Sequence, residues 1–313
     1  MVRFLEHGVG NPNLSDSDGL TPLSFAASGG YEGVAKLLER KDVNLDSSDR
    51  YKGVVKLLLE RKDVHLDSSD RYGRTPLSFA AFGGHEGLVK LLLEREDVNP
   101  NPRDICHRSP LFYAATRGNK DVVKLLLERE DVNPDPRDRN DLTPLSYAAW
   151  EGHRDVVNLL LGQREVNPDS RDCDGRTPLS LATSRGHEGV VKLLLKSKEV
   201  NPDLSDLYGG TPLSLATSGR YNGIGKLLLE RMEVNPDLLE KNNRTPLSVA
   251  ASGGHEDVAN LLLQRGDVDT NSSDNYSQKL LSHVTLMRRG AWRGTCRMLE
   301  APIPNHWKIA IEC

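Results

Sequence analysis

The chain has 313 residues, of which 27% are charged and 37% hydrophobic, and its formal net charge is −4. This charge gives no general attraction to nucleic acid, so a nucleic-acid-binding function is not expected. No apolar run approaches the roughly 18 residues of a membrane-spanning helix, and the first residues, MVRFLEHGVG, lack the apolar segment of a signal peptide. We therefore expect no membrane association and an intracellular protein, either cytoplasmic or nuclear.

One sequence unit recurs along most of the chain, and its clearest copy runs from Thr75 to Asn99 as TPLSFAAFGGHEGLVKLLLEREDVN. From Thr75 onward, successive copies of the TPL core (once SPL, at Ser109) begin 34 residues apart. A constant period in the thirties indicates stacked repeats that each contact only their neighbours. The fold class is therefore all-α, a solenoid of helix-turn-helix units.

Each unit contains two short predicted helices and a loop. Thr75 is a good N-cap, Pro76 suits the first helical position, and Gly83-Gly84 can end the first helix. A second helix is expected from Glu86, with an apolar face that includes the Leu91–Leu93 run. The Asn-, Pro- and Asp-rich segment that follows predicts an extended, hairpin-like loop.

In chain order, residues 1–15 resemble the second half of a repeat, and residues 16–273 form the array. Within the array, residues 49–69 form a short unit that lacks a first helix. Either a true deletion or an imperfect gene model explains that unit, and in the first case we expect the weakest part of the array there. Residues 274–313 are expected to be a degenerate C-terminal cap and tail, although a basic partner-binding tail is also possible.

The pattern D-x-x-G-x-T-P-L-x-x-A-A-x-x-G-H-x-x-V-V-x-x-L-L-L resembles the ankyrin repeat over roughly residues 1–275. Two departures are evident. Serine replaces the histidine of the family's TPLH core, as at Ser78 and Ser146, and N-P-D segments such as Asn133-Pro134-Asp135 lengthen the following loop. The resemblance implies a protein-binding scaffold without enzymatic activity.

No catalytic, cofactor or metal site is expected. The histidines of the Gly-His-Glu turns, such as His85 and His187, recur once per repeat and so lie too far apart to share a metal ion. We expect these histidines to bond across the interhelical turn. Cys106 and Cys173 occupy loop positions two repeats apart, beyond the reach of a disulfide, and we expect free thiols.

Candidate partner-binding residues are the large side chains that vary between copies while the frame around them stays constant. In the ankyrin family such contacts come from the loop tips and the exposed side of the first helix. The candidate set is Arg71, Tyr72, Arg74, Phe82, Ile105, His107, Arg108, Arg117, Arg139, Asn140, Trp150, Glu151, Arg176, Arg185, Leu207, Tyr208 and Arg244. Leu142 and Lys241 continue the same line.

Trp150 is the most informative of these residues, because its equivalents include Phe82, Thr116 and Ser184, so the frame does not require a ring there. The ring either contacts a partner or lies on its neighbour. The leading hypothesis is a scaffold that binds a protein or peptide along a concave groove lined by loop tips and first helices. The alternative is a fragment, or the sensing region, of a larger receptor-type protein.

Overall fold

The computed structural model describes residues 12–30 and 64–269, and within them every regular element is an α-helix. The helices are α2 (Pro22–Ser28), α4 (Pro76–Gly83), α5 (Glu86–Leu93), α6 (Pro110–Arg117), α7 (Lys120–Leu127), α8 (Pro144–Glu151), α9 (Arg154–Leu161), α10 (Pro178–Ser184), α11 (Glu188–Leu194), α12 (Pro212–Ser218), α13 (Asn222–Leu229), α14 (Pro246–Gly253) and α15 (Glu256–Gln264). The prediction of an all-α fold made of helix pairs is confirmed.

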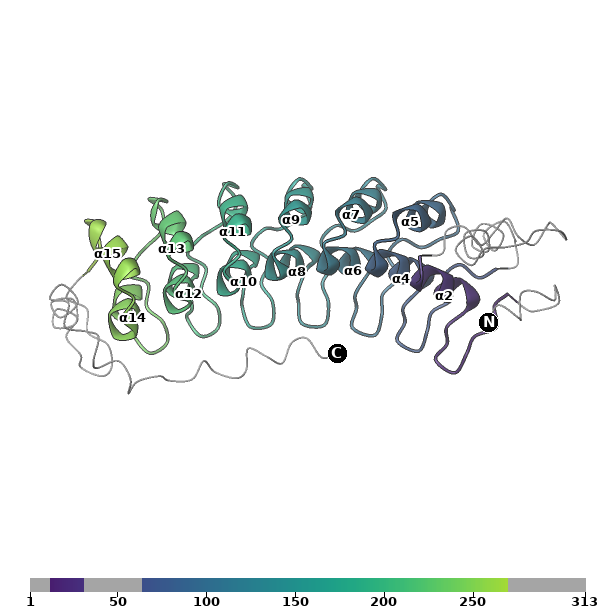
Figure 1. Cartoon of the computed structure of the whole chain (residues 1–313), viewed down its shortest axis with the longest axis horizontal. Helices are drawn as coiled ribbons and strands as arrows, with labels where there is room; N and C mark the ends of the chain where they lie inside the picture. Colours follow the sequence, from purple (N-terminus) through teal and green to yellow (C-terminus); the bar gives the residue numbers. More distant parts are fainter. Residues whose placement is uncertain (1–11, 31–63, 270–313) are drawn as a thin grey trace, which may run out of the picture. The chain divides into compact units, whose positions relative to one another are not determined.

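The chain divides into two compact units. Unit 1 comprises residues 1–139, 143–148 and 158–166, and unit 2 comprises residues 140–142, 149–157 and 167–313. In unit 1, α4 packs between α2 and α6, and α5 packs against α7. In unit 2, α12 packs between α10 and α14, and α13 packs between α11 and α15. Each unit thus has a row of first helices and a row of second helices, which Figure 1 shows.

The first helices begin as the sequence predicts. The Thr75 hydroxyl accepts a hydrogen bond from the Ser78 backbone N–H, Pro76 is the first helical residue, and Gly84 ends the helix in the left-handed conformation (φ 72°). Such a cap satisfies a backbone donor that the helix itself leaves unbonded. The same threonine cap recurs in α2, α10, α12 and α14.

The serine that replaces histidine in the TPLS core completes this cap. The Ser180 hydroxyl accepts a hydrogen bond from the Thr177 backbone N–H at 2.8 Å, and the Thr177 hydroxyl accepts one from the Ser180 N–H at 3.2 Å. Ser214 and Thr211 make the same reciprocal pair. These serines are buried and bonded to the cap, so their role is structural.

The core lies between the two helix rows. Leu77, Ala80 and Ala81 of α4 are at most 1% exposed, and the small alanines permit close approach of the neighbouring first helices. In the second helix the middle leucine of the run, Leu92, is fully buried, whereas its neighbours on either side are half-buried. The buried face of this helix is therefore narrower than the face predicted from the full leucine run.

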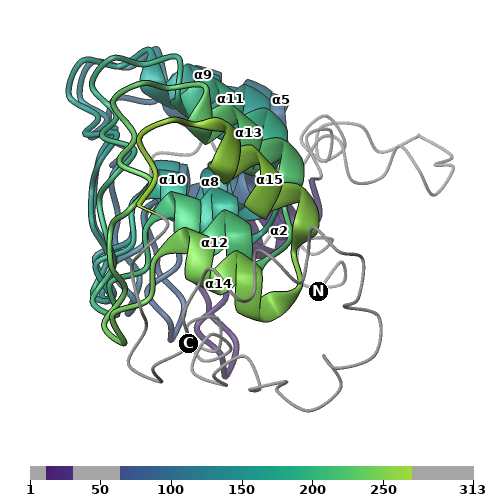
Figure 2. The ribbon, with the colours of Figure 1, turned by 90° about the vertical axis from the view of Figure 1, so that its left-hand side faces the viewer.

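The loops between repeats join neighbouring copies through single backbone bonds rather than paired strands. The Ile105 N–H donates to the Tyr72 carbonyl in unit 1, and the Leu207 N–H donates to the Asp174 carbonyl in unit 2. Figure 2 shows the loops of α10–α15 gathered on one side of their helices. Among the described residues, the hairpin-like loops that the sequence predicts thus occur without strands.

The interval that contains the short unit at residues 49–69 lies mostly outside the described residues. On its two sides, however, the contacts are those of neighbouring repeats. Helix α2 packs on α4, and the Arg71 N–H donates to the Asp18 carbonyl at 2.9 Å, as Ile105 does to Tyr72 one repeat later. The row of first helices is therefore uninterrupted from α2 to α4, with no gap where a first helix is missing from the sequence.

The segment that connects α2 to the next described residues is longer than the segment that connects α4 to the next repeat. Residues 31–63 separate Gly30 from Val64, whereas residues 85–97 separate the equivalent Gly84 from Val98. The surplus is a stretch of twenty residues, and residues 31–50 are a near copy of residues 51–71. We interpret the irregularity as a duplicated second half of a repeat rather than a lost first half.

Deletion of residues 31–50 tests this interpretation. The deletion joins Gly30 to Tyr51 and leaves residues 51–63 to make the connection, the same number that the next repeat uses. We expect the midpoint of thermal unfolding to stay the same or rise, because a shorter connection lowers the closure entropy by roughly 1 kcal/mol. Deletion of the equivalent residues 85–104 is the control, and it should destabilise the protein by removing α5 and Asp104. An equal loss of stability in both variants would contradict the interpretation.

Candidate functional site

The loop tips, defined as residues 70–74 and their equivalents, are built around a buried aspartate. One Asp70 oxygen, Oδ1, accepts hydrogen bonds from the backbone N–H groups of Tyr72 and Arg74 at 2.9 and 2.8 Å. Asp104, Asp172 and Asp206 bind their own loops in the same way. Because the carboxylate holds the backbone from inside, the residue that follows it lies at the surface of the loop, as Arg71, Ile105, Cys173 and Leu207 do.

The turn at each loop tip also requires one residue in the left-handed region, which glycine adopts most readily. Gly73 and Gly209 fill this position with φ values of 79° and 80°. His107 fills it with φ 65°, and Asp141 and Asn243 fill it in two other repeats. His107 is exposed, so this candidate residue is presented to solvent from a conformation that histidine seldom adopts.

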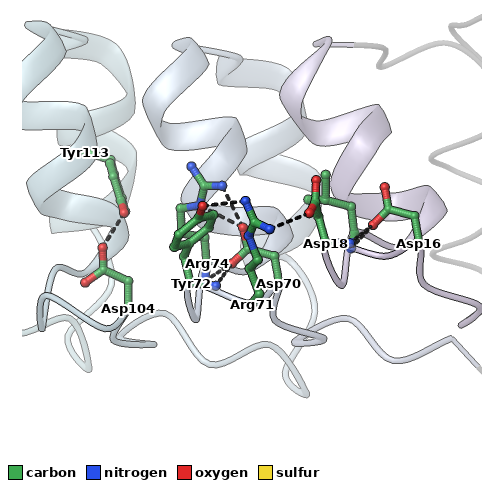
Figure 3. Close-up of polar contacts among 9 residues, drawn as sticks. Asp16, Asp18, Asp70, Arg71, Tyr72, Arg74, Asp104 and Tyr113 are labelled. Carbon is green, nitrogen blue, oxygen red and sulfur yellow. Dashed lines mark hydrogen bonds and ion pairs between the residues drawn. The ribbon is translucent and has the colours of Figure 1, made fainter. Parts of the chain in front are cut away.

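Several candidate arginines are already engaged by carboxylates of the chain. Arg74 binds Asp70 through Nε and Nη2, and Arg71 pairs with Asp18 at 2.9 Å while its guanidinium donates to the Tyr72 hydroxyl. Figure 3 shows both arginines held within this network. Their charge is thus balanced by these aspartates, so we expect both arginines to bind an external anion more weakly than an unpaired arginine would.

Arg108 and Arg176 are engaged in the same manner. Arg108 lies 3.7 Å from Asp138, and Arg176 bonds Asp172 at 2.7 Å and Asp174 at 3.0 Å. Arg176 is only 6% exposed, because its side chain is enclosed by these contacts. The prediction that Arg176 is an exposed contact residue is therefore wrong. Leu142, which continued the same line of candidates, is also buried, at 6% exposure.

Arg244 has a different local partner. Its guanidinium donates to the Ser252 hydroxyl, and the residue is half-buried. Arg117, Arg139 and Arg185 differ from all of these, since they are exposed and form no ion pair with any residue that the structure describes. The candidate arginines therefore fall into two groups. Those of the first group are bound to other side chains of the protein, and those of the second group (Arg117, Arg139 and Arg185) are exposed and have no ion-pair partner among the described residues.

The large apolar candidates are exposed as the sequence predicts. Ile105, Leu207 and Tyr208 at the loop tips are 48%, 56% and 46% exposed, and Tyr72 is 39% exposed. Lys241 lies over the Tyr208 ring at 5.3 Å. Asn140 is half-buried and its carbonyl accepts the Cys173 N–H, whereas Glu151 is exposed. Met232, at 82% exposure, is an exposed apolar side chain that the comparison of copies did not select.

The second exposed region is the turn edge, defined as residues 82–84 and their equivalents, where a first helix ends. Phe82 is 47% exposed and Trp150 is half-buried. Arg117 lies over the Phe82 ring at 4.9 Å, and Arg185 lies over the Trp150 ring at 4.2 Å. Both rings thus lie against an arginine of the following repeat.

The residues after the turn edge connect successive repeats. Nε2 of His187 is 2.9 Å from the Trp150 carbonyl, and the Asn119 amide donates to the Ala81 carbonyl at 2.8 Å. His85 makes the equivalent contact with the Ser28 carbonyl at 3.3 Å. The expectation of a bond across the histidine's own turn is therefore wrong in direction, since His85 and His187 bond the preceding repeat.

Burial alters the pKa of several groups that lie in the loops or bond to them. Burial and a hydrogen bond to Asp104 raise the pKa of Tyr113, and burial raises the pKa of Tyr147, which donates to Asp138. Burial also raises the pKa of Glu240, which stands where the other loops have aspartate. These shifts come from packing, and none creates a paired acid and base.

No constellation for catalysis or metal binding emerges in the described part of the chain. Residues 12–30 and 64–269 contain no cluster of three or more His, Cys, Asp or Glu side chains that could hold a metal ion. Cys106 and Cys173 are free thiols, and burial is the main cause that raises the pKa of Cys173, which disfavours a reactive thiolate. Within the same residues, no helix is long and apolar enough to cross a membrane.

Comparison with known families agrees with this geometry. A family model described as ankyrin repeats (3 copies) matches residues 47–104, 97–172, 163–238 and 198–274, and a model of the single ankyrin repeat matches residues 18–50. The chain belongs to the ankyrin-repeat family. Ankyrin repeats are generally protein–protein interaction modules. A search of curated proteins gave no match for this ankyrin-repeat chain.

Glu240 offers a test of the loop electrostatics in this ankyrin-repeat array. Burial raises its pKa above the ordinary value of 4.5, so the folded state binds the proton more tightly than the unfolded state. The stability that protonation brings is present below that value and is lost as pH rises through the folded pKa. We expect Glu240→Gln to be more stable than the wild type near neutral pH.

The difference between Glu240→Gln and the wild type should shrink as the pH falls toward the unfolded value, since both side chains are then neutral. Urea unfolding at a series of pH values measures this difference. Glu130→Gln, at an exposed position, is the matched control and should show little difference at any pH. A stability difference for Glu240→Gln that does not depend on pH would contradict the electrostatic cause.

Proposed function

We propose that this chain is a non-enzymatic scaffold that binds a partner protein or peptide through its loop tips and the exposed ends of its first helices. The supporting observation is that large side chains are exposed at loop-tip positions where the frame does not need them. Ile105, Leu207 and Tyr208 make no contribution to the buried core, and their equivalents in other repeats include Arg71 and Cys173. Aromatic, aliphatic and arginine side chains on a rigid surface are typical of protein interfaces.

The proposed surface comprises the exposed members of the candidate set. It retains the loop-tip residues together with Phe82, Arg117, Trp150 and Arg185, and it leaves out the buried Arg176. Contacts along a concave groove lined by these residues belong to the proposal. An intracellular location is also part of it, because ankyrin repeats are common in intracellular proteins.

The rigidity of the frame supports a binding role. The loop tips that begin at Asp70, Asp104, Asp172 and Asp206 are each held by a buried carboxylate with two backbone bonds, so their exposed side chains are presented from a fixed backbone. Binding then costs less conformational entropy than it would from a flexible loop. Nucleic acid is a poorer fit, because the chain has a net charge of −4 and several loop arginines are paired with aspartates.

The double variant Leu207→Ser with Tyr208→Ser tests the proposal. Proteins captured by the immobilised wild type are identified by mass spectrometry, and their affinities are then measured by titration. We expect the double variant to weaken binding of a genuine partner by at least about 1–2 kcal/mol, because two exposed apolar contacts are lost.

Met232→Ala is the matched control for this experiment, since Met232 is 82% exposed but lies outside the loop tips and the turn edge. It should capture the same proteins as the wild type with unchanged affinity. Thermal unfolding should be similar for all three proteins. If the double variant binds every captured protein as tightly as the wild type, the loop tips are not the binding surface.

A further inference from the structure

At the turn edge, an aromatic residue of one repeat and an arginine of the next repeat occur together twice in the sequence. Phe82 is followed 35 residues later by Arg117, and Trp150 is followed 35 residues later by Arg185. Where the ring is absent, the arginine is absent as well. The positions that follow Thr116, Ser184 and Ser218 at the same spacing are Glu151, Gly219 and Gly253.

The structure gives the physical basis of this pairing. Arg117 lies over the Phe82 ring at 4.9 Å in unit 1, and Arg185 lies over the Trp150 ring at 4.2 Å in unit 2. A ring face attracts a guanidinium and restricts its orientation. A guanidinium that lies over a ring face can still donate from its remaining N–H groups to a ligand.

These two arginines differ from the loop-tip arginines that are paired with carboxylates. Arg71, Arg74 and Arg176 direct their N–H groups to aspartates of the chain. Arg117 and Arg185 are exposed, and no carboxylate in the described residues pairs with either of them. An oriented guanidinium with unused donors matches the two oxygens of a carboxylate.

We propose that Arg117 and Arg185 are each a carboxylate-binding position that recognises an acidic side chain of a partner protein. This inference rests on the proposed scaffold function and adds the chemical class of the partner. Arg117 donates to one acidic side chain while Phe82, 47% exposed, contacts its methylene groups, and Arg185 acts in the same way beside Trp150.

A peptide titration on the full chain tests this inference. The probe is a fluorescein-labelled peptide of repeated Gly-Glu-Ser-Glu, and its neutral counterpart has glutamine in place of glutamate. We expect the wild type to bind the glutamate peptide at least about tenfold more tightly, as expected for charge-assisted bonds. Arg117→Gln and Arg185→Gln should each reduce this preference in part, and the double variant should abolish it.

Arg95→Gln is the control, because Arg95 is paired with Asp97 and lies at the end of the second helix, away from the turn edge. It should leave the preference unchanged, and thermal unfolding should confirm that all variants fold. Equal binding of the two peptides by the wild type overturns the inference, as does an undiminished preference in the double arginine variant. Tighter binding of a single-stranded oligonucleotide of equal charge also overturns it.

The failure of this inference can be told apart from the failure of the scaffold function. If the wild type captures a partner that Leu207→Ser with Tyr208→Ser loses, and yet shows no preference for the glutamate peptide, the scaffold function stands and the acidic specificity is overturned. If the preference depends on both arginines, the inference is supported whichever partner the loop tips bind.

Discussion

The hydrogen bonding of the buried aspartate that begins most of the described loops is the interaction on which the presentation of this protein's surface depends. One carboxylate oxygen, as in Asp70, holds two backbone N–H groups and thereby sets the turn that exposes the next side chain. The second oxygen takes a side-chain donor, which is Arg74 for Asp70 and the Tyr113 hydroxyl for Asp104. The same carboxylate therefore shapes the loop and neutralises an arginine or binds a tyrosine nearby.

A second row of carboxylate and amide bonds runs along the edge where each second helix enters its loop. Asp203 Oδ2 accepts the backbone N–H of Asn235, and the Asn235 side-chain oxygen accepts the N–H of Asp237. The N-P-D segments thus connect one repeat to the next by alternating bonds. The cost of this arrangement is desolvation, which raises the pKa of Asp203.

The exposure of several candidate residues could be anticipated from the comparison of copies, because exposed positions are free to vary while buried ones are not. That comparison selected Ile105, Leu207 and Tyr208, and all three are exposed. It could not separate Arg185 from Arg176, since both vary between repeats. Only the packing distinguishes them: Arg176 is enclosed by Asp172 and Asp174, whereas Arg185 lies over a ring at the surface.

The sequence by itself determined the all-α class, the period and the helix caps, because these depend on local propensity and on a pattern copied many times. Only the tertiary structure decided which carbonyl His187 bonds, which arginines remain available, and that α2 packs directly on α4 across residues 31–63. The reason is that each of these features joins residues of different repeats. A contact between repeats depends on which copies become neighbours in space, and spacing along the chain does not specify this where the repeat is irregular.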